Sequence, residues 1–226
     1  MLHFKDEFET EDYKVIRHCI GSFGVNTYII ICKKTHKAAV IDPGGEVDAL
    51  VECLRSHDAQ VDWMLLTHSH IDHIAGSQGL ADGVSIGHVA YHRADDIVVE
   101  HIPDMCKMFG VPVVPMPRRT DDLAESSEFS VCGLQVRTIA TPGHTPGGVF
   151  FYIAEHGLCF TGDTLFKGSV GRTDFEGGDG HALRQSLDLL LSILGDDVKI
   201  LPGHGKYSTM GAERASNFYL KIDKYR

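Results

Sequence analysis

The stretch that decides the fold reads Thr67-His68-Ser69-His70-Ile71-Asp72-His73-Ile74-Ala75-Gly76. It places three imidazoles and a carboxylate directly after the apolar run 61–66, which is typical of a buried strand. Imidazole nitrogens and carboxylate oxygens are the ligands that Zn²⁺ and similar divalent ions take, and such a cluster is poor material for packing a core. The sequence therefore predicts a metal site where this strand ends.

The composition is that of a globular protein with a small-molecule substrate. With 226 residues, 43% of them hydrophobic and 23% charged, residues 1–226 are expected to form a single domain. The 21 Lys and Arg against 31 Asp and Glu give a formal charge of −10, so nucleic acid and anionic membranes are not expected as partners. The acidic start and the lack of a long apolar run predict neither a secretory leader nor a membrane span. The oligomeric state stays open.

Cysteine usage favours a reducing compartment. The chain contains six scattered cysteines and no Cys-x-x-Cys pair: Cys19, Cys32, Cys53, Cys106, Cys132 and Cys159. This pattern differs from the dense framework of small secreted proteins, so we expect free thiols and a cytoplasmic protein.

The hydrophobic pattern alternates between β-rich and helical parts. Short strands are expected over residues 13–20, 25–32 and 38–41, before an amphipathic helix that starts near Val47. In the second half, hairpins are expected around Gly133 and Gly157. They are followed by a helix over residues 183–194, a strand over 198–201 and a last helix over 209–222.

Residues 92–117 contain four prolines and are expected to form an irregular cover segment with one helix-like piece over 95–101. The order β-rich, α, β-rich, α predicts an α+β fold with sheets inside and helices outside.

Metal-competent side chains follow four of the expected strands. Beyond the strand before His68, apolar runs lead into His144, Asp163 and His204 through turns that contain Gly or Pro. Ligands at strand ends lie at a rim of the sheets, so these loops are expected to converge on one point. Asp42 ends another strand just before Pro-Gly-Gly, and we expect it to form hydrogen bonds beside the site rather than to bind metal.

These motifs resemble those of the metallo-β-lactamase fold superfamily over nearly the whole chain. The match comprises His68-x-His70-x-Asp72-His73, Thr-Pro-Gly-His-Thr-Pro-Gly around His144, Thr-Gly-Asp-Thr-Leu-Phe around Asp163 and Pro-Gly-His-Gly around His204. The segment 168–175 and the short C-terminus are most similar to small glyoxalase II-like hydrolases, the hydroxyacylglutathione hydrolase group. The resemblance implies a four-layer αββα sandwich with the metal site at one edge of its two sheets.

The resemblance also implies a ligand set. By position, the first metal would be held by His68, His70 and His144, the second by Asp72, His73 and His204, and Asp163 would bridge the two. The cofactors would be two divalent ions, with Zn²⁺ as the first choice and iron or manganese as alternatives, because this donor set suits all three.

The implied reaction is hydrolysis of thioesters of the S-(2-hydroxyacyl)glutathione type. A metal-bridging hydroxide, oriented by Asp72 as a catalytic residue, would attack the thioester carbonyl. Arg172 stands where the resemblance places a substrate-binding basic residue that contacts glutathione. An ion pair between Arg172 and Asp174 that fixes the loop is an equal alternative.

The chain departs from the full-length glyoxalase II pattern at the rim of the site. Residues 1–226 are not expected to include the additional C-terminal helical region that supplies glutathione contacts in that pattern. Phe218 replaces the usual Pro after Asn, and Lys206 replaces the usual Pro after His-Gly. Three alternative functions stay open: a persulfide dioxygenase with mononuclear iron, a lactonase on the same dinuclear site, and a metal-binding scaffold without turnover. The number of bound metals separates the first of these from a hydrolase.

Overall fold

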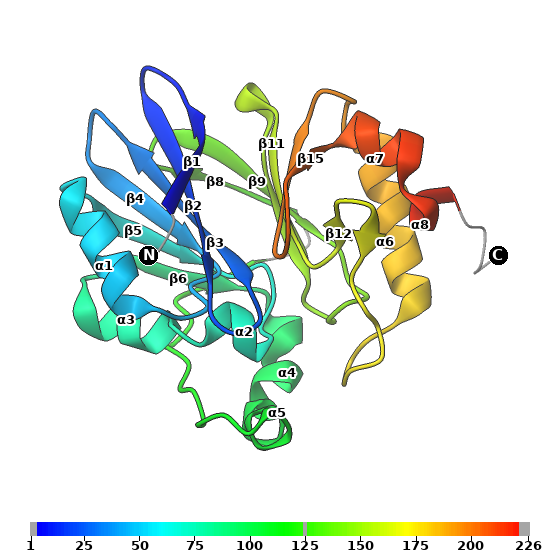
Figure 1. Cartoon of the computed structure of the whole chain (residues 1–226), viewed down its shortest axis with the longest axis horizontal. Helices are drawn as coiled ribbons and strands as arrows, with labels where there is room; N and C mark the ends of the chain where they lie inside the picture. Colours follow the sequence, from blue (N-terminus) through cyan, green and yellow to red (C-terminus); the bar gives the residue numbers. More distant parts are fainter. Residues whose placement is uncertain (1–3, 124–125, 222–226) are drawn as a thin grey trace.

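Two β-sheets pack face to face, and helices cover their outer faces (Figure 1). The computed structural model describes residues 4–123 and 126–221. This arrangement is the α+β, four-layer αββα sandwich expected from the sequence.

The first sheet has the strand order β1-β2-β3-β4-β5-β6-β7. Its strands are β1 (Phe4–Glu9), β2 (Tyr13–Ile20), β3 (Val25–Cys32), β4 (Lys37–Ile41), β5 (Gln60–Leu65), β6 (His88–Tyr91) and β7 (Asp121–Asp122). Pairing is antiparallel up to β4 and parallel from β4 to β7. The carboxyl ends of β4, β5 and β6 therefore meet at one edge.

The second sheet has the strand order β15-β14-β11-β10-β9-β8. Its strands are β8 (Ser126–Val131), β9 (Leu134–Ala140), β10 (Val149–Ile153), β11 (Leu158–Gly162), β14 (Lys199–Pro202) and β15 (Ser208–Thr209). The predicted hairpin at Gly133 is confirmed, because Val131 pairs with Leu134 across a two-residue turn. Both turn residues have positive φ, 57° at Cys132 and 89° at Gly133, as such turns require. A small ribbon of β12 (Leu165–Phe166) and β13 (Ser169–Val170) follows β11.

The helices flank the two sheets. On the side of the first sheet lie α1 (Val47–Ser56), α2 (Ile71–Ile74), α3 (Ser77–Gly83), η1 (Arg93–Asp95), α4 (Asp96–Glu100) and α5 (Ile102–Phe109). On the side of the second sheet lie α6 (Gly180–Ile193), α7 (Met210–Ser216) and α8 (Phe218–Lys221), while η2 (Ala154–His156) joins β10 to β11. No helix within the described residues has the length and apolar character to cross a membrane.

The inner apolar layer joins the two sheets. Tyr28 from β3 and Phe160 from β11 are each at most 2% exposed, and their ring centroids lie 5.1 Å apart. The Tyr28 hydroxyl also donates a hydrogen bond of 2.8 Å to the Pro202 carbonyl of β14. Alternate residues of β3, such as Ile29, face the outer layer beneath the helices instead. Because both faces of β3 are covered, all of its residues are buried.

Two sequence expectations about helices were wrong. The cover segment contains α5, whose Pro103 lies in the first helical turn, where the missing N–H costs no intrahelical hydrogen bond. The last helix is broken at Asn217, whose side-chain amide donates to the Ser169 carbonyl and to Glu213 Oε2. This inward hydrogen bonding separates α7 from α8, and the expected end at Ile222 lies outside the described residues.

Substitution of Phe160 tests whether the sheets share one core. Phe160→Ala leaves a cavity between the sheets, so we expect the free energy of unfolding to fall by about 3–5 kcal/mol. The control is Leu189→Ala on α6, where the side chain is 38% exposed and a change within about 0.5 kcal/mol is expected. Urea denaturation of the metal-free proteins measures both. Equal small losses would contradict the shared core.

Candidate metal centre

Loops after four strands converge at one edge of the sandwich. The loop after β5 carries His68 and His70, and the turn after β9 carries His144. Asp163 directly follows β11, and His204 lies two residues after the end of β14. Three overlapping groups of donors result, and in each group the ligand atoms all lie within 4.8 Å of one another: His68, His70, His144; His68, His73, Asp163; and Asp72, His73, His204. The structure thus brings together all seven side chains that the sequence singled out.

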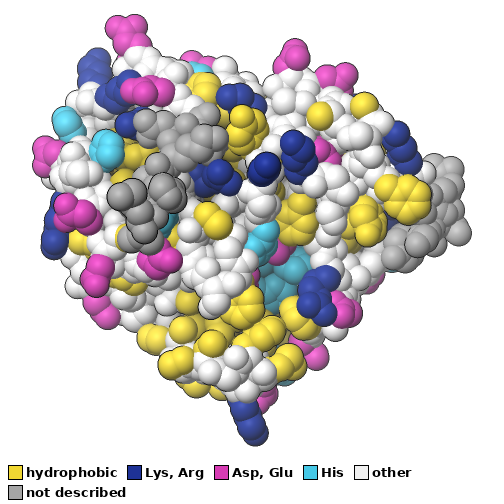
Figure 2. Space-filling model, in the orientation of Figure 1, with side chains coloured by type: hydrophobic (Ala, Val, Ile, Leu, Met, Phe, Trp, Pro, Cys, Tyr) yellow, Lys and Arg dark blue, Asp and Glu magenta, His cyan; other side chains and the backbone are white. Residues whose placement is uncertain are grey.

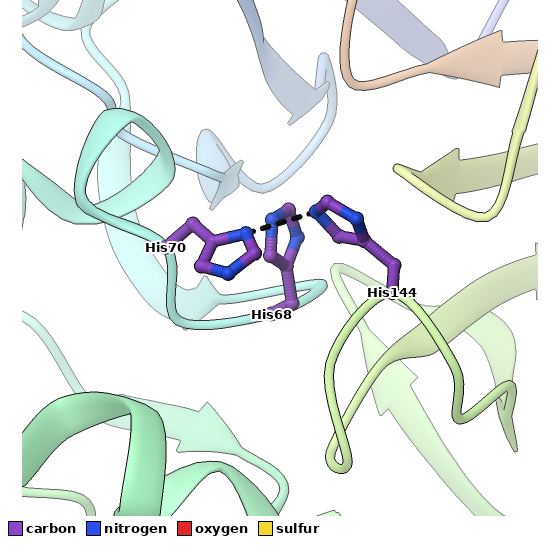
Figure 3. Close-up of side chains that lie close together, drawn as sticks. All are labelled: His68, His70 and His144. Carbon is purple, nitrogen blue, oxygen red and sulfur yellow. Dashed lines mark hydrogen bonds between the residues drawn. The ribbon is translucent and has the colours of Figure 1, made fainter. Parts of the chain in front are cut away.

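The first group consists of three buried histidines whose rings point toward a common centre (Figure 3). His70 Nδ1 and His144 Nε2 are 2.9 Å apart. The rings of His68 and His70 are nearly perpendicular, at 88°, with centroids 4.9 Å apart. This crossed arrangement aims one nitrogen of each ring at the same point.

The second group is more open to solvent. His204 Nε2 lies 3.1 Å from Asp72 Oδ2, and these side chains are 27% and 19% exposed. His73 is fully buried behind them, with its Nε2 3.3 Å from His204 Nε2. Substrate therefore has access to the site from the side of Asp72 and His204.

The Asp163 carboxylate lies between the two groups. Its Oδ1 is 3.3 Å from His73 Nε2, and its Oδ2 is 3.4 Å from His144 Nε2. The space for this carboxylate depends on Gly203, where an added Cβ would lie only 2.2 Å from Asp163 Oδ1. A single carboxylate in this position can bind metal on either side.

The donor set fits divalent metal ions. His68 Nδ1 is 3.1 Å from Thr67 Oγ1, which already donates to Asp42, so we assign the His68 proton to Nδ1. His68 Nε2 is then a buried lone pair with no hydrogen-bond partner among the described residues. A buried acceptor without a partner is costly unless a cation satisfies it.

Burial and neighbouring charges set the protonation of the histidines. Burial, and then the other imidazoles, lower the pKa of His68, and burial with His144 lowers the pKa of His70 to about 3. These rings are neutral at pH 7, which is the form that binds metal.

Around Asp72, His73 and His204, neighbouring charges outweigh burial in setting the pKa values. Burial alone would lower the pKa of His73, but the carboxylates of Asp163 and Asp72 outweigh it and raise this pKa. Burial likewise raises the pKa of Asp72, but His73 and His204 outweigh it and lower this pKa. Ionised carboxylates here favour positive charge, whether a proton or a metal cation.

Asp42 orients the segment that follows β5 at two points. It accepts hydrogen bonds from the Thr67 N–H at 2.7 Å and from Thr67 Oγ1 at 2.6 Å. Its Oδ2 also accepts from His73 Nδ1 at 2.9 Å, which leaves His73 Nε2 to face the site. The hydrogen-bonding role expected for Asp42 is confirmed.

Asp95 is a supporting residue that the sequence analysis missed. Its side chain is fully buried and accepts from the Ser69 N–H at 2.8 Å, the Gly147 N–H at 2.6 Å and Thr145 Oγ1 at 3.1 Å. Asp95 therefore ties the loop of His68 and His70 to the turn of His144. Burial, partly offset by these hydrogen bonds, raises its pKa to about 6. Its partners are mainly backbone groups from distant loops, so no sequence spacing could have marked it.

Arg172 lies at the mouth of the site and forms the ion pair expected as one alternative. Its Nε and Nη2 donate to Asp174 at 2.6 and 2.7 Å, and its Cζ lies 3.9 Å from the Phe175 ring centroid. The Arg172 backbone carbonyl also accepts from His144 Nδ1 at 2.7 Å, leaving His144 Nε2 to face the site. The contact between Arg172 and a substrate stays a prediction.

Removal of the Asp95 carboxylate is expected to loosen the first group of histidines. Asp95→Ala leaves buried donors unsatisfied, so we expect metal affinity to fall about 10–100-fold, measured by titration with a competing chelator. Asp96→Ala is the matched control, because the adjacent side chain is 50% exposed and pairs with Arg119 outside the centre. Equal affinities in the two variants would show that Asp95 does not position the ligands.

Several known proteins are similar to this chain in sequence or in fold. The sequence profile of the Metallo-beta-lactamase superfamily matches residues 20–205. Hydroxyacylglutathione hydrolase GloC of Haemophilus influenzae is 36% identical over 185 residues, which cover 81% of this chain and 87% of that protein.

Two solved structures are similar over most of the chain. The crystal structure of BLEG-1 B3 metallo-β-lactamase is 28% identical with a TM-score of 0.86, covering 92% of this chain and 100% of that one. TTHA1623 in a di-iron-bound form is 34% identical with a TM-score of 0.78, covering 89% and 98%. With its αββα sandwich and its cluster of metal-competent side chains, the chain belongs to the metallo-β-lactamase superfamily of metal-binding hydrolases.

Proposed function

We propose that this protein is a dinuclear metal-dependent hydrolase that cleaves thioesters of the S-(2-hydroxyacyl)glutathione type. The observation that carries the proposal is the position of Asp163 between two groups of ligands, within 3.4 Å of a histidine nitrogen in each. The hydroxyacylglutathione hydrolase GloC, similar over most of the chain, supports this choice of substrate.

Seven ligands shared between two ions leave coordination positions open, as a catalytic site requires. The ions would supply an acidified water as nucleophile and polarisation of the substrate carbonyl. We propose Zn²⁺ as the first choice, with iron or manganese as alternatives, because imidazole and carboxylate suit all three. The similar TTHA1623, solved in a di-iron form, keeps iron in consideration.

Asp72 is proposed to orient the attacking water. Its carboxylate lies on the solvent-accessible side of the centre, 19% exposed, and its pKa is lowered by His73 and His204 despite burial. Because the carboxylate is already ionised, it can accept a hydrogen bond from the attacking water without first losing a proton. A thiolate whose parent acid has a pKa of about 8.5 then leaves without a general acid.

Arg172 is proposed to bind the glutathione part of the substrate. Asp174 occupies its Nε and Nη2, and Nη1 has no hydrogen-bond partner among the described residues. The side chain is 55% exposed beside the mouth of the site. A second carboxylate, from glutathione, can therefore approach the same guanidinium.

A reducing location is proposed as well. All six cysteines, each within the described residues, are free thiols. Free thiols support a cytoplasmic enzyme, where glutathione thioesters are available.

Loss of one ligand tests the reaction and the metal count together. We expect two metal ions per chain and cleavage of S-lactoylglutathione in the native protein. In His70→Ala, kcat/KM should fall by more than about 100-fold. Loss of a residue that only hydrogen-bonds to a metal ligand already lowers activity by about 10–100-fold, and loss of the ligand itself should cost more. Elemental analysis and a thiol-release assay measure these quantities. His181→Ala, at an exposed histidine of α6, is the control and should match the native protein.

Other outcomes favour other functions. One iron per chain with oxygen consumption on glutathione persulfide would favour the dioxygenase. Two ions with lactone hydrolysis but no thioester cleavage would favour the lactonase.

A pair of variants separates the two roles of Arg172. If the guanidinium binds glutathione, Arg172→Ala should raise KM for S-lactoylglutathione roughly tenfold, whereas Asp174→Ala, which releases the guanidinium, should not. If the ion pair only fixes the loop, both variants should impair the reaction equally. Steady-state kinetics on S-lactoylglutathione and on an uncharged lactoyl thioester make the comparison. Arg93→Ala, at a side chain 75% exposed, serves as the control for loss of a surface charge.

A further inference from the structure

An apolar cavity opens directly beside the first group of histidines. It has a volume of about 240 Å³ and lies between α5 and the segment around Phe175. Its apolar lining is formed by Val98, Met105, Met108, Phe109 and Phe175. We call it the α5 cavity. One residue of the metal centre, His70, also lines it.

Exposed hydrophobic side chains surround this cavity. Met108 is 70% exposed and Phe109 is 38% exposed, although both are large and apolar. Figure 2 shows hydrophobic side chains gathered at the lower end of this face, next to histidine side chains visible in a hollow. Apolar surface concentrated beside a functional site indicates ligand binding, and methionine adapts its shape to different ligands.

Aromatic rings connect the cavity with the metal centre. The Phe175 ring centroid lies 5.7 Å from that of His70 and 6.3 Å from that of Phe109. Met105, Phe109 and Phe175 also line the hollow over the metal site, together with Asp72, Asp163 and His204. The α5 cavity and the hollow over the metal site are therefore adjacent. An acyl chain whose carbonyl carbon lies at the metal centre can extend from the hollow into the cavity.

Charge at the rim indicates which part of a thioester enters. The carboxylates of Asp104, Asp174 and Glu176 line the cavity, accompanied by His101. Arg172, the nearby guanidinium, is paired with Asp174. Carboxylates disfavour the leaving thiolate and the carboxylates of glutathione, whereas an apolar acyl chain carries no charge. The cavity is also below the ~300 Å³ of a complete ligand pocket, which suits one part of a substrate.

We propose that the α5 cavity is an acyl subsite and that, among 2-hydroxyacyl thioesters of glutathione, the enzyme prefers those with a longer unbranched apolar chain over the short lactoyl thioester. This inference rests on the proposed thioester hydrolysis and specifies its acyl class. In the reaction, water oxygen bonds to the carbonyl carbon and the C–S bond breaks with its electron pair on sulfur. The products are a carboxylic acid and glutathione.

A chain-length series with the metal-loaded enzyme tests the subsite. The substrates are the S-acetyl, S-butyryl, S-hexanoyl, S-lactoyl and S-(2-hydroxyhexanoyl) thioesters of glutathione. We expect kcat/KM to rise roughly threefold for each added methylene until the cavity is full, because each buried methylene adds transfer free energy. S-lactoylglutathione should be cleaved less efficiently than the S-(2-hydroxyhexanoyl) thioester.

A charged substitution in the cavity provides a second test of the acyl subsite. Met108→Glu should lower the hexanoyl-to-acetyl ratio of kcat/KM about tenfold, and Met108→Leu should retain it. Met108 is exposed, so neither change threatens folding. The matched control is Leu189→Glu, at an exposed leucine of α6 on the opposite side of the sandwich, which should leave the ratio unchanged.

Several outcomes would overturn the inference. A flat chain-length series, a preference for the lactoyl over the 2-hydroxyhexanoyl group, or an unchanged ratio in Met108→Glu would each contradict an acyl subsite. If kcat/KM instead rose with the size of an apolar thiol in a series of acetyl thioesters, the leaving group would occupy the cavity. Failure of the proposed function has a different signature, because no thioester of the series would then be cleaved by the protein with both metals bound.

Discussion

The structure depends on holding five imidazoles and two carboxylates together where two sheets meet. Removing such groups from water is costly unless each finds a partner, and side chains of this kind do not assemble by hydrophobic packing. The surrounding fold supplies the restraint. Tyr28 and Phe160 join the sheets through the inner apolar layer, and the strand ends that carry the ligands are fixed by that packing.

Buried carboxylates then set the directions of individual ligands. Asp42 links Thr67 and His73, while Asp95 links the loop of Ser69 to the turn after β9. Asp42 thus fixes two points of the segment that follows β5, and Asp95 joins that segment to the turn after β9. The effect is that hydrogen bonds with neighbouring groups aim the ligand nitrogens at the centre.

The two sides of the centre differ in chemistry. The side of Asp72 and His204 is polar and open to solvent. On the side of His70, by contrast, the α5 cavity is lined by methionine and phenylalanine beneath an acidic rim. The centre thus lies between a polar, solvent-exposed environment and an apolar cavity.

Sequence alone was sufficient for the layer order, most strands and the set of metal-competent residues. These features depend on local patterns, namely apolar periodicity and ligands placed directly after strands, and such patterns are visible along the chain. The family followed from the same motifs around His68, His144, Asp163 and His204.

Only the tertiary structure decided the features that depend on contacts between distant segments. Asp95 acts through backbone groups of remote loops, and Asn217 breaks the last helix because its amide bonds to the ribbon after β11. The α5 helix was hidden by the prolines of its segment, and with it the cavity beside His70. Local pattern determined which residues can bind metal, whereas long-range packing determined how they are aimed and what lies beside them.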